Sequence, residues 1–258
     1  MKRKPTSIYA HIHRLYIFTI DTFNNRKRPL SVLFTILMIY FINSVLSYAL
    51  VVQNLPKNMS SVDVAINLSQ IVLLFMSFYF WFLMRRKEYL ATDNEEVNKR
   101  YRKIRFAARN VMMISTGILT LKLSLSIAAL VSMLPVDLKR KDADILLLWD
   151  AYIVWSANVL VFATWYWLLD LGDKYHFCFP LQEKHEIKQW EGDWEPNLID
   201  YWFLAFTTST AFSPTDTKFL SRWSKVLLII QSSLSLIVLT VLAARAVNIL
   251  KFAPPVSN

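Results

Sequence analysis

Glycine is scarce in this sequence. The 258 residues include three glycines, namely Gly117, Gly172 and Gly192. Enzymes that bind nucleotides through a phosphate loop need several closely spaced glycines, because the backbone there must approach the phosphate closely. The sequence contains no such loop, no nucleophile elbow and no pair of carboxylates at catalytic spacing. We therefore expect no catalytic residues and no cofactor, and an enzyme is the class with the least support.

Cysteine and histidine are also rare. The single cysteine, Cys178, cannot form a disulfide within the chain. Together with His176, His185 and Glu186 it offers metal-binding side chains within a short stretch. Their spacing matches no standard zinc pattern, and one cysteine is a weak indication. We therefore expect no metal site.

Long hydrophobic runs are what the sequence has in excess. Hydrophobic residues make up 55% of the chain and the mean hydropathy is +0.33. A helix needs roughly 20 apolar residues to cross a bilayer. Runs of that length indicate an all-α, polytopic membrane helix bundle with about five full spans plus a short pore-like or re-entrant helix. The expected spans are 31–52, 62–84, 111–134, 146–170 and 226–250.

The polar segments divide the chain around these spans. Residues 1–30 form a basic N-terminal segment, either a short interfacial helix or a disordered tail. A four-span bundle follows over 31–171, with a basic loop at 85–110 that should form a helix leading into the third span. An acidic linker covers 172–200, and the last span belongs to a hairpin at 201–250. Residues 251–258 are a short tail.

The distribution of Lys and Arg predicts the orientation. The net charge is +10, and the basic residues concentrate in 1–30 and 85–110, which flank membrane spans. Cytoplasmic loops carry such an excess. We therefore expect a multi-pass membrane protein with a cytoplasmic N-terminus, in which the lipid bilayer is the partner of the basic segments. Nucleic acid is not an expected partner.

The span count leaves two geometries open for the hairpin. The acidic linker 172–200 should be cytoplasmic, because four spans precede it. If 201–212 is re-entrant, this short segment lies on the inner side. If 201–215 crosses instead, the connector 216–225 lies outside. Twelve helical residues cover roughly 18 Å, which is short of a full crossing.

The hairpin has a recognisable order of segments. A short apolar stretch, Asp200-Tyr201-Trp202-Phe203-Leu204-Ala205-Phe206-Thr207, is followed by Thr210-Ala211-Phe212-Ser213-Pro214-Thr215-Asp216. Leu220-Ser221-Arg222 and, at the end of the last span, Ala243-Ala244-Arg245-Ala246-Val247-Asn248 complete it. This hairpin resembles a potassium-channel pore. Over about 146–250, and in the basic 85–110 loop, the chain more closely resembles a family of uncharacterised bacterial integral membrane proteins, from which no biochemical activity carries over.

The filter position lacks the residues that make a pore selective for potassium. Thr-Thr-Val-Gly-Tyr-Gly of such a filter falls on 208–213, where both glycines are replaced. A row of inward-pointing carbonyls is therefore not expected. The candidate ion path consists of Thr207, Thr208, Ser209, Thr210, Ala211, Phe212, Ser213 and Asp216. Its hydroxyls could line a hydrated path or could satisfy the backbone at a helix end.

Polar residues inside the spans are the remaining candidates. Lys122 lies near the middle of the third span, Asp150 within the fourth and Arg245 near the end of the last. Lys122 has either a functional role or a structural one, and Arg245 is explained by snorkelling to the interface. The amides of Asn43, Asn67, Gln70, Asn158 and Gln231 should join helices.

These patterns favour a channel-like membrane protein that passively conducts ions, with monovalent cations as the expected ions and a homo-oligomer as the expected assembly. The missing filter glycines support an alternative, a non-conducting membrane protein that binds a partner and uses the hairpin for packing. A transporter or a lipid-acting enzyme, motivated by Lys122, is the third hypothesis.

Overall fold

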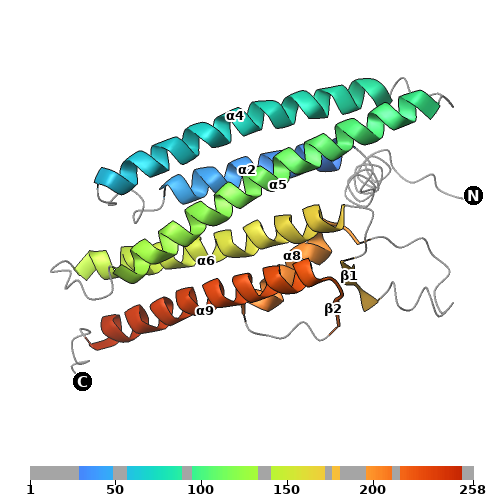
Figure 1. The fold of residues 1–258 in the computed structure, drawn as a ribbon. Helices are drawn as coiled ribbons and strands as arrows, with labels where there is room; N and C mark the ends of the chain where they lie inside the picture. The colour runs from blue at the N-terminus through green and yellow to red at the C-terminus, as the bar shows by residue number, and fades with distance from the viewer. Residues whose placement is uncertain are drawn as a thin grey trace, which may run out of the picture.

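The computed structural model describes residues 29–48, 57–88, 95–132, 141–171, 176–180, 196–210 and 216–251, and nearly all of them are helical (Figure 1). The elements, in chain order, are α2 (Pro29–Tyr48), α4 (Lys57–Glu88), α5 (Glu95–Ser132), α6 (Lys141–Asp170), β1 (Phe177–Cys178), α8 (Leu198–Ser209), β2 (Lys218–Phe219) and α9 (Arg222–Lys251). The expected all-α class is confirmed, apart from two strands of two residues each.

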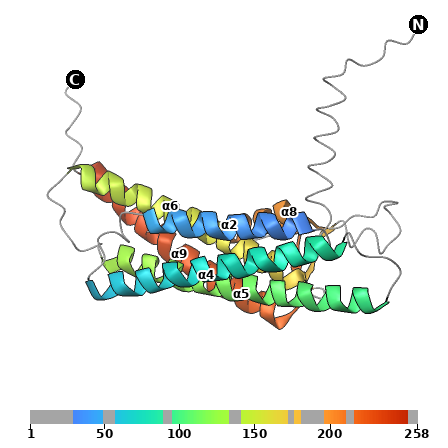
Figure 2. The same cartoon turned by 90° about the horizontal axis from the view of Figure 1, so that it is seen from above.

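The long helices lie side by side, and successive ones run in opposite directions (Figures 1 and 2). Helix α6 is at the centre and contacts α2, α5, α8 and α9. In the apolar part of α6, 61% of the residues are buried, against 17% in α4 and 22% in α9. Helices α4 and α9 are therefore the outer helices of the bundle.

Within the described part of the chain, four helices are long and apolar enough to cross a membrane. Their apolar segments are Val64–Leu83, Arg102–Ser132, Leu147–Asp170 and Arg222–Val247, and α2 contains the shorter apolar segment Thr35–Leu46. This composition is compatible with a multi-pass membrane protein. The expected span boundaries agree closely with the helices from α4 onward, and α5 joins the basic helix and the third span in one continuous helix, as predicted. Residues 49–52 of the expected first span, like segment 1–28, lie outside the described residues.

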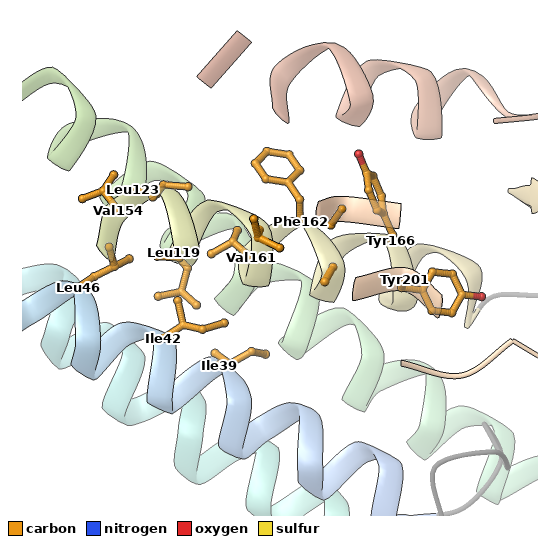
Figure 3. Packing of buried hydrophobic residues seen from close by; sticks show 14 of the residues in the cluster. Ile39, Ile42, Leu46, Leu119, Leu123, Val154, Val161, Phe162, Tyr166 and Tyr201 are labelled. Carbon is orange, nitrogen blue, oxygen red and sulfur yellow. The ribbon is translucent and has the colours of Figure 1, made fainter. Parts of the chain in front are cut away.

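The core is apolar where α2, α5 and α6 meet. Ile39, Ile42 and Leu46 of α2 point toward Leu119 and Leu123 of α5 (Figure 3).

Helix α9 has the opposite pattern. Its inward side carries Ser224, Gln231, Ser235 and Arg245, which are all buried, together with Val238 and Val241. Its outward side exposes large apolar residues such as Trp223. Soluble proteins place polar residues outside, so this inverted pattern fits a helix surrounded by lipid.

The two short strands hold together the two ends of segment 179–217, which contains α8 and is called the α8 hairpin, or simply the hairpin, from here on. Strand β1 pairs with β2 in antiparallel fashion, with Phe177 opposite Phe219 and Cys178 opposite Lys218. The chain therefore begins and ends the α8 hairpin at the same end of the bundle.

Candidate functional site in the C-terminal hairpin

A capping box fixes the start of α8. The side-chain oxygen Oδ1 of Asn197 accepts hydrogen bonds from the backbone N–H groups of Ile199 (2.9 Å) and Asp200 (3.3 Å). In return, the Asp200 carboxylate accepts from the Asn197 N–H at 2.7 Å. Both residues satisfy N–H groups that a helix start leaves without partners, and the acidic side chain suits the positive end of the helix dipole. The sequence prediction started this segment three residues later, at Tyr201.

The buried carboxylate of Asp170 connects the end of α6 to α8 and β1. One oxygen, Oδ1, accepts from the backbone N–H of His176 at 3.0 Å, and the other accepts from the hydroxyl of Tyr201. Asp170 is 4% exposed and Tyr201 is fully buried. Three segments are thereby joined at one carboxyl group at the end of the bundle where the hairpin begins.

The start of α9 is attached at the same place. Leu220 donates its backbone N–H to the carbonyl oxygen of His176 at 3.0 Å, and the Ser224 hydroxyl donates to the same oxygen at 3.2 Å. The ring nitrogen Nδ1 of His176 lies 2.6 Å from Oγ of Ser221. Ser221 Oγ also accepts from the Ser224 N–H at 3.1 Å, so it caps α9. The His176 ring, one of the potential metal ligands, is therefore engaged in a hydrogen bond to Ser221.

Aromatic rings pack around the two strands. The ring of Phe177 contacts those of Tyr166, Tyr201 and Phe219 with centroids 5.3–5.8 Å apart, and Phe179 lies 5.3 Å from Tyr201. The pairs are edge-to-face, the arrangement that aromatic rings prefer. This cluster closes the end of the bundle around the hairpin.

Gln231 is the hub that joins the last turn of α8 to α6 and α9. Its Nε2 donates to the carbonyl oxygen of Ala205 and to Oγ of Ser209, both at 2.7 Å, and its Oε1 accepts from the Tyr166 hydroxyl at 2.5 Å. Gln231 is 0% exposed. Each terminal atom of this buried amide is used, so the hub specifies how α8 sits against its neighbours.

The hydroxyls of the candidate ion path bond within α8 or to Gln231. Thr207 donates to the carbonyls of Phe203 and Leu204, Thr208 to that of Leu204, and Thr210 to those of Phe206 and Thr207, at 2.8–3.2 Å. Thr208 and Ser209 are buried, whereas Thr207 and Thr210 are partly exposed. Asp216 is exposed beside β2. Ala211, Phe212 and Ser213 lie outside the described residues.

A second amide bridges α6 and α9 deeper in the bundle. Nδ2 of Asn158 donates to Oγ of Ser235 at 2.6 Å, and both side chains are buried. Together with the Tyr166–Gln231 bond, this pair sets the register of two antiparallel helices. The same register places Asp150 and Arg245 at one level, and both are 3% exposed. Arg245 is thus buried in the bundle, which differs from the expected snorkelling.

Lys122 lies in the other half of the molecule. Its ammonium donates to Oδ1 of Asn67 in α4 at 2.8 Å and to Oδ1 of Asn43 in α2 at 3.3 Å, and the side chain is 2% exposed. Nearby, Gln70 and Ser115 exchange two hydrogen bonds, of 2.9 Å and 2.6 Å, between α4 and α5. The in-span amides do join helices, as expected.

The sequence left open whether a carboxylate of α6 approaches Lys122. The bond from Trp165 Nε1 to Thr120 Oγ1, at 2.8 Å, sets the register of α5 against α6. In that register Asp150 is roughly 20 Å along the helix axis from the level of Lys122, and Asp170 is roughly 10 Å away. Amide oxygens from α2 and α4, not a neighbouring acid of α6, surround the ammonium.

Among the residues that the structure describes, no three His, Cys, Asp or Glu side chains are grouped to hold a metal ion. The network of Asp170, Tyr201, His176 and Ser221 was missed by the sequence prediction. The available signal was Asp170 itself, a carboxylate at the end of an apolar span.

Comparison with family models, curated proteins and solved structures gives no match to this chain.

Proposed function

We propose that the chain is a multi-pass protein of the bacterial inner membrane in which α8 enters the bilayer part-way and returns to the cytoplasmic side. In this proposal the hairpin passively conducts monovalent cations, and several copies of the chain assemble around it. The proposal also includes membership in the family of uncharacterised membrane proteins whose hairpin this chain resembles. The observation that carries the re-entrant geometry is the β1–β2 pairing, because this pairing brings both ends of the hairpin to one side of the bundle.

The depth of α8 supports a re-entrant hairpin. Gln231 lies nine residues into α9, so its level is about 14 Å below the start of that helix. Gln231 bonds to Ser209, the last residue of α8. The C-terminal end of α8 is therefore about half-way through a hydrocarbon layer of about 30 Å.

The polarity of α8 favours cations at that depth. A helix carries a partial negative charge at its C-terminal end and a partial positive charge at its N-terminal end. The capping box neutralises the N-terminal end of α8 at the start of the hairpin, whereas the C-terminal carbonyls lie at mid-depth beside Thr207 and Thr210. This arrangement attracts a cation to the middle of the membrane.

A second function rests on a different observation. Thr207, Thr208 and Thr210 give their hydroxyls to carbonyls of α8, and Ser209 is bonded to Gln231. Hydroxyls used in this way anchor a helix and need not line a path. The alternative is a non-conducting protein in which the same hairpin is a packing element and binds a partner.

Cysteine labelling tests the topology. Cys178 is first replaced by Ser, and single cysteines are then placed at the exposed positions Lys99 in α5 and Lys218 in β2. An impermeant thiol reagent should label both from the cytoplasmic side of inverted vesicles. Labelling of the two positions from opposite sides would rule out a hairpin that returns to the side of the basic loop.

Ion flux tests the conduction. Purified protein in liposomes should pass potassium and sodium and exclude chloride, and Thr210→Val should reduce the flux several-fold. Thr240→Val is the matched control, because Thr240 is an exposed residue of α9 whose hydroxyl also bonds to its own helix. Absence of flux from folded protein would favour the non-conducting alternative, and stoichiometric co-purification of a partner would support it.

A further inference from the structure

Two polar atoms on one face of α6 are buried and have no hydrogen-bond partner among the residues that the structure describes. They are the acceptor Oδ1 of Asn158 and the donor Nε1 of Trp155. Asn158 is 0% exposed. Buried polar groups without partners are rare in folded proteins, and each one points to something that satisfies it. These two are three residues apart and therefore lie one helical turn from each other on the same side of α6.

The surroundings place both atoms beside the last turn of α8. The Trp155 ring packs edge-on against Phe206 of α8 with centroids 5.8 Å apart. The Asn158 amide bonds through its other terminal atom to Ser235 of α9, at 2.6 Å. Ser235 is one turn from Gln231, which holds the end of α8. The two atoms thus belong to the region where α6, α8 and α9 meet.

Their chemistry selects the ligand. A cation would be repelled by the indole N–H, and an anion would be repelled by the amide oxygen. A neutral molecule that accepts one hydrogen bond and donates another matches both atoms. Cβ atoms one helical turn apart are separated by about 5–6 Å, and one water bridges two heavy atoms about 5.5 Å apart, so side chains at these two positions are near enough to share a water. The hydroxyl of Ser235 offers a third polar group, and buried waters typically have about three partners.

We propose that α6, α8 and α9 form an internal water site, in which one water accepts from Trp155 Nε1 and donates to Asn158 Oδ1. The site hydrates the bundle next to the C-terminal end of α8. It does not depend on ion conduction, because a non-conducting hairpin would hold the same water.

The test observes the indole N–H groups directly. Protein labelled with ¹⁵N at tryptophan is placed in nanodiscs, and cross-peaks between each indole N–H and water are recorded by NMR. Trp155→Phe assigns the Trp155 signal. Trp165 is the internal control, since its Nε1 is bonded to Thr120 Oγ1 at 2.8 Å. We expect a water cross-peak at Trp155 and none at Trp165.

Variants at Asn158 decide whether that water is held as proposed. Asn158→Leu removes the acceptor and should abolish the cross-peak at Trp155, whereas Asn158→Asp keeps an acceptor and should retain it. Ser235→Ala controls for loss of the Asn158–Ser235 bond and should also retain it. Should Asn158→Leu fail to fold, the wild-type cross-peak and the Asn158→Asp variant remain decisive. The proposal would be overturned if the Trp155 indole N–H showed no water cross-peak in the folded wild-type protein, or if that cross-peak were unchanged in Asn158→Leu.

Discussion

Buried polar groups have different partners in the two halves of the bundle, the N-terminal half formed by α2, α4 and α5 and the C-terminal half formed by α6, α8 and α9. In the N-terminal half, the charged Lys122 is surrounded by neutral amide oxygens from α2 and α4. In the C-terminal half, the neutral amide of Gln231 joins three helices, and the carboxyl group of Asp170 is kept at the end of the bundle. Away from its ends, the half that contains α8 therefore has a neutral hub, whereas the other half has a buried charge.

This difference has energetic consequences. A buried charge that loses an acceptor costs more than a buried neutral group that does, because the charged group has lost more hydration. Substitutions around Lys122 should therefore be more harmful than the substitution of Lys122 itself. Around Gln231 the order should be the reverse, because the hub supplies all three bonds.

The largest effect is expected at Asn67. Replacing Asn67 with Leu removes the acceptor 2.8 Å from the Lys122 ammonium and should lower the free energy of unfolding by about 3 kcal/mol. Lys122→Met removes the charge with its cost and should lower it by less. Unfolding titrations in mixed micelles measure both, and Asn67→Asp, which keeps an acceptor, is the control. A larger loss for Lys122→Met than for Asn67→Leu would contradict this account of the N-terminal half.

The next effect is expected at Gln231. Gln231→Leu removes three hydrogen bonds, and at about 0.6 kcal/mol for each bond inside a membrane the loss should be about 2 kcal/mol. The same titration measures it. Ser233→Leu is the matched control, because Ser233 is an exposed residue of the same helix and should change stability little. Equal effects of the two substitutions would mean that Gln231 is not the hub.

Tyr201 tests the carboxylate end of the hairpin. Tyr201→Phe removes the hydroxyl that donates to Asp170 and should cost about 1.5 kcal/mol, the range for a hydrogen bond to a carboxylate. Backbone amide exchange in α8 should become faster, since its first turn is no longer tied to α6. Tyr152→Phe, at an exposed position of α6, should leave that exchange unchanged. Unaltered exchange in Tyr201→Phe would show that the bond from Tyr201 to Asp170 does not hold α8 in place.

The smallest effect is expected at the start of α9. Ser221→Ala removes the cap that accepts from the Ser224 N–H and should cost about 1 kcal/mol. The thermal midpoint in detergent measures this change. Ser232→Ala, at an exposed position inside α9, is the reference. A stability equal to that of the reference would remove Ser221 from the set of residues that fix the hairpin.

The sequence predicted the helices well because their signal is local. Apolar length located α4, α6, α9 and the end of α5 to within a few residues, and the amides that join helices could be named in advance. Their pairing could not be named, because it depends on how each helix is rotated and where it crosses its neighbours. Thus the sequence singled out Lys122 and Asn67 without indicating that they bond to each other.

The hairpin was harder to predict. Strands β1 and β2 have two residues each, too few to show the alternation that identifies a strand. Their pairing nevertheless brings residues 178 and 218 to neighbouring positions, and the proposal of a re-entrant hairpin rests on it. The hydroxyls of 207–210 were expected either to line a path or to satisfy a helix end. Those of Thr207, Thr208 and Thr210 donate to carbonyls of α8, and these bond partners could not be read from the sequence.

The β1–β2 pairing also makes the hairpin a replaceable cassette. Because Cys178 and Lys218 are opposite each other, residues 179–217 leave and rejoin the bundle at neighbouring points. A segment inserted or exchanged between them need not alter the path of α6 or α9. A segment with a glycine-containing filter, grafted between these two points, would have to replace the bonds that Tyr201 makes to Asp170 and Ser209 to Gln231.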